Sequence, residues 1–370
     1  MSGPRIAVSG YYGCGNTGDE AVLAGILEGF QRRAGVPPES FCVLSADPES
    51  TARLHGVRSA HRMRLGEVRS ALLRSDLLLS GGGSLLQDTT SLRSLAYYVW
   101  IIRLALAAGR PVMLYAQGVG PLRRSASRFL TRIAARRARC ITVRDQESAA
   151  LLRAIGVSQP QPEVTADPAF ALSPAPPERA RAILAAAGAP ADAPLIGFAF
   201  RPWPAGAGFP GELARAVERA AKDCGAHPVL IPFQPPGDLA LAEAVARAAG
   251  VPATVLREQR TPGEMLGVTA CLEGLLAMRL HALIFAAVSG VPSVAAAYDP
   301  KVGHLMRRLG RSGDALELAG FRGEEAGARL AERVVQRETL SADLRARARE
   351  MAALSLVNVD RALAVCGGEA

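Results

Sequence analysis

Short apolar runs alternate with longer amphipathic stretches along almost the whole chain. Buried parallel strands joined by helices produce such a pattern, because helices cover both faces of the sheet and the strands become apolar throughout. The pattern therefore predicts an α/β protein with two doubly wound, Rossmann-like domains that face a central cleft. The predicted strands are 6–9, 41–44, 77–80, 112–116, 141–143 and 164–166 in the first series, and 195–200, 228–232, 253–256, 272–278 and 292–297 in the second.

A proline-rich segment at residues 173–178 separates the two series. We therefore expect an N-terminal α/β domain over residues 1–175 and a C-terminal α/β domain over residues 190–340. Residues 341–370 contain no proline and are predicted to form a helix that crosses back to the N-terminal domain. Ligands of open α/β sheets bind at the carboxyl ends of the strands, so functional residues are expected in loops that directly follow strands.

The charge of the chain is +9, from 43 basic and 34 acidic residues, and only Lys222 and Lys301 are lysines. The arginines are scattered, and the densest run, residues 132–139, contains no aromatic residue. A nucleic-acid platform interleaves basic and aromatic side chains, so no nucleic-acid partner is expected. Weak attraction to an anionic membrane surface fits better, because arginine-rich helical faces hold proteins against lipid without spanning it.

The six cysteines lie far apart in the sequence and show neither paired spacing nor nearby clustered histidines. This spacing predicts reduced, mostly buried thiols, with no metal site and no disulfide framework. The N-terminal apolar run is too short for a signal peptide, and residues 95–116 are interrupted by Arg103 and Arg110. A cytoplasmic protein without a transmembrane segment is therefore expected.

A glycine-rich segment, residues 10–20, follows the first predicted strand. It has neither the dinucleotide pattern nor a Walker A lysine, although glycines here let backbone N–H groups approach a ligand. The two adjacent acids Asp19 and Glu20 would repel a phosphate, so sugar hydroxyls suit them better. The alternative is a tight structural turn capped by Asn16, Thr17 or Asp19. The predicted acceptor-binding residues of this loop are Gly13, Asn16, Gly18 and Asp19.

Two further glycine-rich segments follow strands of the first domain, at residues 80–88 and 117–121. Three consecutive glycines indicate a backbone that passes something closely, so Gly82, Gly83 and Gln117 are predicted to bind the acceptor. Asp88, about one turn into the next helix, is predicted to accept a hydroxyl proton. Its alternative role is to complement the helix dipole. Asp145 is interpreted as a structural helix cap.

The second domain supplies cationic residues after its strands. Arg201 follows the first strand, and a guanidinium there is suited to bind a carboxylate or phosphate. Arg279 and His281 flank Leu280 at a strand-to-helix junction, where they predict an anion site with a proton donor. Lys301 follows a later strand, with a surface turn as the alternative. An anionic small molecule is therefore expected on the second domain and a polyhydroxyl acceptor on the first.

The motifs together resemble the polysaccharide pyruvyl transferases, specifically the CsaB type, from about residue 5 to residue 310. The resemblance rests on GYYGxGNxGDE, GGGSLLQD, QGVGP, VRDxES, TADPAF, MRLHALIFA and YDPKV, in that order. It implies a GT-B-like fold and transfer of pyruvate from phosphoenolpyruvate to N-acetylmannosamine of a cell-wall polysaccharide precursor. The product is a 4,6-ketal, which S-layer homology domains recognise, and phosphate is released.

The resemblance further implies that phosphoenolpyruvate is a co-substrate and that no cofactor is needed. The acceptor is expected to be linked to a polyprenyl diphosphate lipid, which places the enzyme at the cytoplasmic face of the membrane. Arg279 and His281 match the donor-binding arginine and histidine of the family, and Arg201 is expected to be a second donor contact.

Residues and resemblance together suggest a mechanism. Arg201, Arg279 and Lys301 would neutralise the donor, His281 would give a proton to the enol methylene or to the leaving phosphate, and Asp88 or Asp19 would accept a sugar hydroxyl proton. Two alternatives stay open. One is a GT-B glycosyltransferase of cell-envelope polysaccharide synthesis that uses a nucleotide sugar, and the other is a non-catalytic sugar- or anion-binding protein of the same fold.

Overall fold

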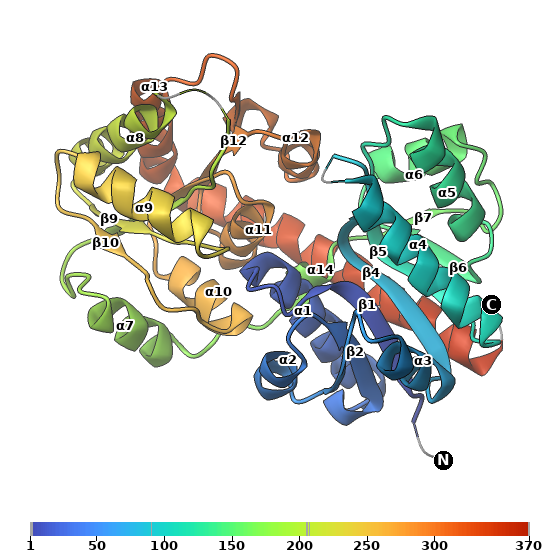
Figure 1. Cartoon of the computed structure of the whole chain (residues 1–370). Coiled ribbons are helices and arrows are strands. Elements are labelled where there is room, and N and C mark those ends of the chain that lie inside the picture. The colour runs from blue at the N-terminus through green and yellow to red at the C-terminus, as the bar shows by residue number, and fades with distance from the viewer. Residues whose placement is uncertain (1–2, 90, 205, 207, 369–370) are drawn as a thin grey trace. The chain divides into compact units, whose positions relative to one another are not determined.

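The computed structural model describes residues 3–89, 91–204, 206 and 208–368 (Figure 1). The chain divides into two compact units. The first contains the N-terminal segment up to Cys14, residues Asp19–Leu172, and the C-terminal segment from Met351. The second contains Gly15–Gly18 and Ser173–Glu350. The main division between the units therefore falls between Leu172 and Ser173, whereas the sequence predicted that the first domain ends at residue 175.

The first unit is built on a seven-stranded parallel sheet in the order β3-β2-β1-β4-β5-β6-β7. Val8 pairs with Val43 on one side and with Leu79 on the other, and all three side chains are fully buried. Burial on both faces explains the unbroken apolar runs in the sequence. The strands are β1 (Ile6–Tyr12), β2 (Phe41–Ser45), β3 (Arg58–His61), β4 (Leu77–Leu86), β5 (Val112–Val119), β6 (Cys140–Val143) and β7 (Glu163–Val164).

Helices cover both faces of this sheet and create two separate apolar cores. One core packs α1 and the C-terminal part of α14 against the sheet, and the other packs α3, α4, α5 and α6 against the opposite side. The helices of this unit are α1 (Thr17–Ala34), α2 (Pro48–His55), α3 (Leu65–Leu73), α4 (Leu92–Ala107), α5 (Ser125–Ala135) and α6 (Gln146–Ala154), with short 3-10 turns η1 (Pro38–Ser40) and η2 (Pro168–Ala171).

The last helix, α14 (Arg337–Gly367), belongs to both units because its residues from Met351 onward pack within the first unit. Asn358 is fully buried there, accepts a hydrogen bond from the Thr165 hydroxyl at 2.8 Å and donates to the Ala166 carbonyl at 3.2 Å. Arg361 forms a bidentate ion pair with Glu163. These contacts explain why the polar C-terminal residues form a helix on the first unit rather than a free tail.

The second unit has a six-stranded parallel sheet in the order β10-β9-β8-β11-β12-β13. The strands are β8 (Leu195–Ala199), β9 (His227–Leu230), β10 (Thr254–Val255), β11 (Gly274–Ala277), β12 (Ser293–Ala297) and β13 (Ala315–Glu317). The helices are α7 (Pro177–Ala186), α8 (Phe209–Cys224), α9 (Gly237–Ala248), α10 (Pro262–Ala270), α11 (Leu280–Ser289), α12 (Pro300–Arg308) and α13 (Gly323–Val335), with the 3-10 turn η3 (Ser312–Asp314). The predicted fold class, two parallel α/β units, is confirmed.

Candidate active site

Four neighbouring strands of the second unit end next to polar residues. Arg201 follows β8, Gln234 follows β9, Arg279 follows β11 and Tyr298 follows β12. These strands are adjacent in the order β9-β8-β11-β12. The strand order reverses between β8 and β11, and ligands of parallel sheets bind at the carboxyl ends around such a reversal. The topology therefore brings the candidate residues of the second unit to one place.

Arg279 is held in a fixed orientation by a buried carboxylate. It occupies the N-cap position of α11, and its guanidinium forms a bidentate ion pair with Asp238, which is 1% exposed. Arg279 also donates to the Gln234 side-chain oxygen at 3.2 Å. Asp238 in turn accepts from the backbone N–H groups of Phe233 at 3.1 Å and Gln234 at 3.0 Å. The loop after β9 and the first turn of α9 thus position the arginine that follows β11.

This arrangement limits what Arg279 offers to a ligand. A guanidinium has five N–H donors, and three of them bind Asp238 and Gln234. Two donors remain for an anion, and the Asp238 carboxylate offsets the charge of the arginine. Neither Asp238 nor Gln234 was predicted as a site residue from the sequence. The available signal was their place in a Gln-Pro-Pro-Gly-Asp segment directly after a predicted strand.

Arg201 and Lys301 share one aromatic side chain. The Arg201 guanidinium donates to the Tyr298 hydroxyl at 3.0 Å and lies 4.6 Å from the centre of its ring. The Lys301 ammonium lies 5.7 Å from the centre of the same Tyr298 ring. The Trp203 ring also packs against Tyr298, with 5.0 Å between the two ring centres. Within the described part of the chain, Arg201 Nε is buried without a hydrogen-bond partner. A buried unpaired donor is costly, which indicates a position for an anionic ligand.

The start of α1 lies beside His281. Gly15–Gly18 groups with the second unit, where the Thr17 N–H donates to the Phe233 carbonyl at 2.9 Å. The Asn16 side-chain oxygen accepts from the Gly18 N–H at 3.0 Å, as the structural alternative for this turn predicted. A Cβ atom on Gly18 would lie only 2.2 Å from His281 Nδ1. Asn16 and Gly18 were predicted to belong to the first domain, but the structure groups both with the second unit.

Substituting Gly18 with Ala is expected to displace His281 and to lower kcat about 100-fold, because a misplacement of about 1 Å has that effect on an oriented group. The free energy of unfolding should change little, since an imidazole ring can rotate away. Gly303→Ala is the matched control: Gly303 lies in α12, and a Cβ there meets nothing within 4 Å. Steady-state kinetics of both variants test this. Equal kcat values would show that the close approach at Gly18 has no functional role.

Gly13, unlike Gly18, lies in the first unit and is bound by a buried pair of side chains. Its N–H donates to Glu20 Oε1 at 2.8 Å, and Glu20 Oε2 lies 2.8 Å from His55 Nε2. The side chains of Glu20 and His55 are only 6% and 4% exposed. Glu20 therefore shapes the loop, and the expectation that it faces a sugar hydroxyl is wrong.

The three glycines at 81–83 lie within β4 rather than after it, contrary to the sequence-based expectation. Gly82 has φ +72°, and a Cβ there would lie 2.1 Å from a Val22 methyl group on α1. Gly83 has φ +107°, and a Cβ there would lie 3.0 Å from Asp19 Oδ1. Both positions require glycine, and the backbone of β4 passes directly beside the half-buried carboxylate of Asp19.

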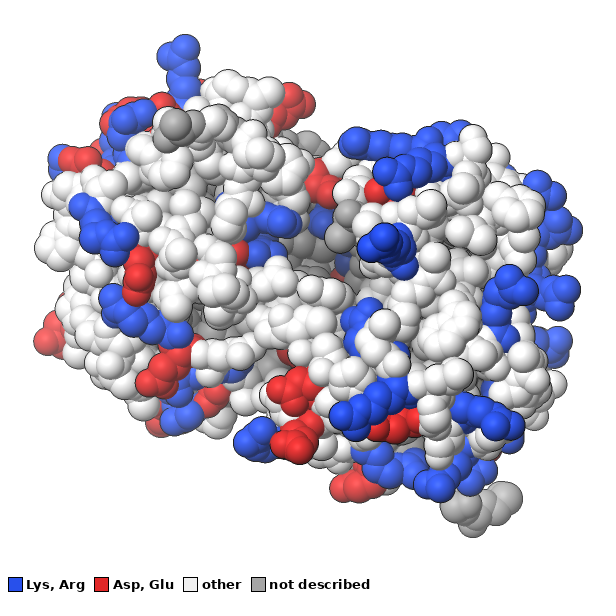
Figure 2. Space-filling model, viewed as in Figure 1, with Lys and Arg blue, Asp and Glu red and all other residues white. Residues whose placement is uncertain are grey.

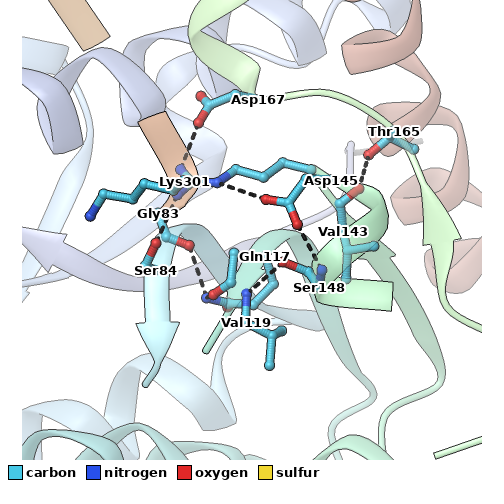
Figure 3. Close-up of polar contacts among 12 residues, drawn as sticks. Gly83, Ser84, Gln117, Val119, Val143, Asp145, Ser148, Thr165, Asp167 and Lys301 are labelled. Atoms are coloured by element: carbon cyan, nitrogen blue, oxygen red, sulfur yellow. Dashed lines mark hydrogen bonds and ion pairs between the residues drawn. The ribbon is translucent and has the colours of Figure 1, made fainter. Parts of the chain in front are cut away.

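A buried polar network supports this part of β4 (Figure 3). Arg144 donates to Ser84 Oγ at 2.7 Å and to Asp167 at 2.9 Å, and Gln117 donates to the Gly83 carbonyl at 3.0 Å. Gln117 is fully buried, so the expected direct contact between its amide and a saccharide is wrong. Asp145 caps α6 by accepting from the Ser148 N–H at 2.7 Å, as predicted.

Asp88 lies in the loop before α4, which begins at Leu92, so its predicted place inside that helix is wrong. It is 7% exposed and accepts from the backbone N–H groups of Arg123 and Arg124 at 2.8–3.0 Å. Burial raises the pKa of Asp88, but these hydrogen bonds lower it more, and the net pKa is below its usual value. The Asp88 carboxylate is therefore weakly basic, and its oxygens already accept hydrogen bonds from the backbone, so it is a poor proton acceptor. This favours Asp19 as the residue that accepts the hydroxyl proton.

All six cysteines are free, as expected, but each is half-buried rather than mostly buried. Burial raises the pKa of Cys224 and of Cys366 to about 11. It also raises the pKa of Cys14, Cys42, Cys140 and Cys271. The thiols are therefore protonated near neutral pH and are weak nucleophiles.

The family model described as polysaccharide pyruvyl transferase matches residues 16–300. No curated protein matches the chain. Among solved structures, Anabaena HepE in complex with UDP and glucose is 14% identical with a TM-score of 0.65, covering 100% of both chains. UDP-GlcNAc 2-epimerase from Neisseria meningitidis is 12% identical with a TM-score of 0.62, covering 97% of this chain and 99% of that one. The wall teichoic acid polymerase TagF is 12% identical with a TM-score of 0.59, covering 99% and 89%. These similarities show a fold of the GT-B type.

Proposed function

Because the chain belongs to the polysaccharide pyruvyl transferase family and is a transferase, we propose that its donor is phosphoenolpyruvate and its acceptor an N-acetylmannosamine-containing cell-wall polysaccharide precursor. The reaction forms a 4,6-ketal and releases phosphate, as in the CsaB type. The observation that supports this donor is the cationic group at the carboxyl ends of β8, β11 and β12, namely Arg201, Arg279 and Lys301. Phosphoenolpyruvate has a carboxylate and a phosphate, which a set of separate cations binds well.

The two helix N-termini of this site add to its preference for anions. Arg279 precedes α11, and Lys301 is the second residue of α12. The positive ends of both helix dipoles favour negative charge. At α12 the Asp299 side chain already accepts from the Lys301 N–H at 3.0 Å and lies 3.6 Å from the Lys301 ammonium, so the ligand shares this cation with Asp299. Arg201 contributes the unpaired Nε donor described above. We assign these three residues to donor binding.

His281 is the proposed proton donor. One sugar hydroxyl adds to the substituted carbon of the enol, while the methylene carbon takes up a proton and becomes a methyl group. The second hydroxyl then replaces the phosphate, which leaves with the other proton. His281 donates either to the methylene carbon or to the departing phosphate, and Asp19 accepts a hydroxyl proton. The ketal keeps the pyruvyl carboxylate, and we propose that S-layer homology domains recognise this charge on the product.

Ligand binding separates this proposal from transfer by a nucleotide-sugar enzyme of the same fold. Phosphoenolpyruvate is expected to raise the melting temperature of the protein by a few degrees at about 100 times its Kd, because it stabilises the folded state by about 2.7 kcal/mol. UDP is expected to leave the melting temperature unchanged. A shift with UDP and none with phosphoenolpyruvate would contradict the proposed donor.

We further propose that the acceptor is attached to a polyprenyl diphosphate lipid at the cytoplasmic face of the membrane. No described helix is long and apolar enough to cross a bilayer. An enzyme acting on such an acceptor therefore needs a surface that meets the lipid from one side.

A further inference from the structure

The first unit contains a long stretch without any acidic residue. Residues 89–144 include eleven arginines and neither Asp nor Glu. The stretch forms α4, β5, α5 and β6, and α4 and α5 pack on the same side of the sheet. Nine of its arginines are exposed: Arg93, Arg103, Arg123, Arg124, Arg128, Arg132, Arg136, Arg137 and Arg139. Figure 2 shows basic side chains along the edge of the first unit where α5 lies.

These charges are not neutralised by ion pairs within the described residues, although that of Arg124 helps to lower the pKa of Asp88. Across the ranges that the structure describes, none of the nine exposed arginines forms an ion pair with a carboxylate. Arg128 Nε donates to the Leu122 carbonyl at 2.9 Å, which orients the side chain without neutralising it. Some exposed arginines elsewhere in the unit do have acidic partners, such as Arg361 with Glu163. The α5 region therefore presents uncompensated positive charge.

Large apolar side chains are exposed on the same side. Phe129 is 60% exposed and Ile133 39% exposed, and they lie one turn apart on α5 among its arginines. Trp100 on α4 is 39% exposed. Met63, Leu65 and Leu73, on α3 or just before it, are also exposed. Six of the ten exposed large hydrophobic residues in the described chain thus belong to α3, α4, α5 and the turn before α3, which we call the α3–α5 face.

Arginines interspersed with bulky apolar side chains match the interfacial region of a bilayer. The guanidinium groups meet anionic headgroups, and Phe129, Ile133 and Trp100 enter the boundary between headgroups and acyl chains. A single-stranded nucleic acid would require a series of aromatic platforms instead, and among the described residues of this face the only exposed aromatic ones are Phe129 and Trp100. The chemistry of the face therefore favours lipid.

We propose that the α3–α5 face, with α5 at its centre, is the surface by which the protein binds a bilayer containing anionic phospholipids. The inference rests on the proposed function only in that a lipid-linked acceptor gives membrane binding its purpose. The binding itself requires neither donor nor turnover, so it is measured separately from the reaction.

The test is co-sedimentation of the full chain with vesicles of phosphatidylcholine and phosphatidylglycerol, and with vesicles of phosphatidylcholine alone. Binding is expected only to the mixed vesicles and should weaken as NaCl rises from about 0.05 to 0.5 M. The variant Arg128→Glu/Arg132→Glu/Arg136→Glu should lower the binding constant at least about 100-fold. Phe129→Ser/Ile133→Ser should lower it about 10-fold, since it removes the apolar contribution without changing the charge.

The matched control is Arg181→Glu/Arg247→Glu/Arg349→Glu, which makes the same charge change on exposed arginines of α7, α9 and α14 in the second unit. This control should bind vesicles nearly as well as the wild type. In a Trp203→Phe variant, emission from Trp100 should shift to shorter wavelength on mixed vesicles. Circular dichroism melts establish that each variant is folded.

Three results would overturn the inference: no binding of the wild type to anionic vesicles, equal loss of binding in both triple variants, or unchanged binding in Phe129→Ser/Ile133→Ser. Phosphate release with a short-chain, water-soluble acceptor is measured in parallel, because it tests the proposed reaction without requiring membrane binding. Phosphate release without vesicle binding contradicts only the proposal that the α3–α5 face binds membranes. Vesicle binding without phosphate release contradicts only the proposed reaction.

Discussion

Replacing His281 with Ala is expected to lower kcat for pyruvyl transfer about 10²- to 10⁴-fold, the usual contribution of a positioned general acid. The side chain is half-buried at the second residue of α11, and its removal leaves no large buried apolar cavity. The free energy of unfolding should therefore change by less than about 1 kcal/mol. The affinity for phosphoenolpyruvate should change much less than kcat, because Arg201, Arg279 and Lys301 remain.

The control for this variant is His227→Ala. His227 is also half-buried in the second unit, but it begins β9 and lies at the amino end of the sheet, where it contacts Thr254 Oγ1 at 2.9 Å. Its loss should leave kcat unchanged. Phosphate release and thermal unfolding measured for both variants separate chemistry from stability. Near wild-type turnover in His281→Ala would remove His281 from the mechanism.

Asp238→Ala is expected to have the largest combined effect on stability and donor binding. Asp238 is 1% exposed, and its removal leaves the Arg279 guanidinium and two backbone N–H groups without their acceptor. Breaking such a buried pair costs about 3–5 kcal/mol of unfolding free energy. Arg279 also loses its fixed orientation, so KM for phosphoenolpyruvate should rise at least about 10-fold. Asp238→Asn keeps an acceptor oxygen and should lie between the wild type and Asp238→Ala.

A buried aspartate with a structural role alone provides the comparison. Asp314 is 4% exposed and pairs with Arg333 at 2.6 Å, but it directly precedes β13 and so lies at the amino end of the sheet. Asp314→Ala should lower the melting temperature without changing KM. Kinetics are measured well below the melting temperature of each variant. Equal KM values for the two alanine variants would contradict a positioning role for Asp238.

The central strands were predictable from sequence because helices cover both faces of each sheet. Val8, Leu79 and Leu276 are fully buried, and their apolar neighbours form the runs that the sequence displays. The edge strands β3 and β13 were not predicted. Arg58–His61 and Ala315–Glu317 each have solvent on one side, so their residues need not be apolar. Edge position alone does not hide a strand, since the edge strands β7 and β10 overlap the predicted strands 164–166 and 253–256; β3 and β13 were missed because they lack an apolar run.

The cationic residues of the candidate site were predictable in place because each directly follows a strand. The partner that each of these residues binds inside the protein was not predictable, because no sequence pattern shows which loops come into contact in the fold. The Asp238 pairing with Arg279 joins residues 41 positions apart, and Gln117 and Asp88 turned out to support backbone. The grouping of Gly15–Gly18 with the second unit likewise depends on a tertiary contact, the hydrogen bond from Thr17 to Phe233.

Phosphate release from phosphoenolpyruvate, with and without a synthetic lipid-linked N-acetylmannosamine disaccharide, tests the central claim most directly. We expect release that depends on the acceptor, equals the amount of pyruvyl ketal found on the saccharide by mass spectrometry, and is lost in His281→Ala. Absence of release with the acceptor present, together with consumption of a nucleotide sugar by the same protein, would contradict pyruvyl transfer from phosphoenolpyruvate.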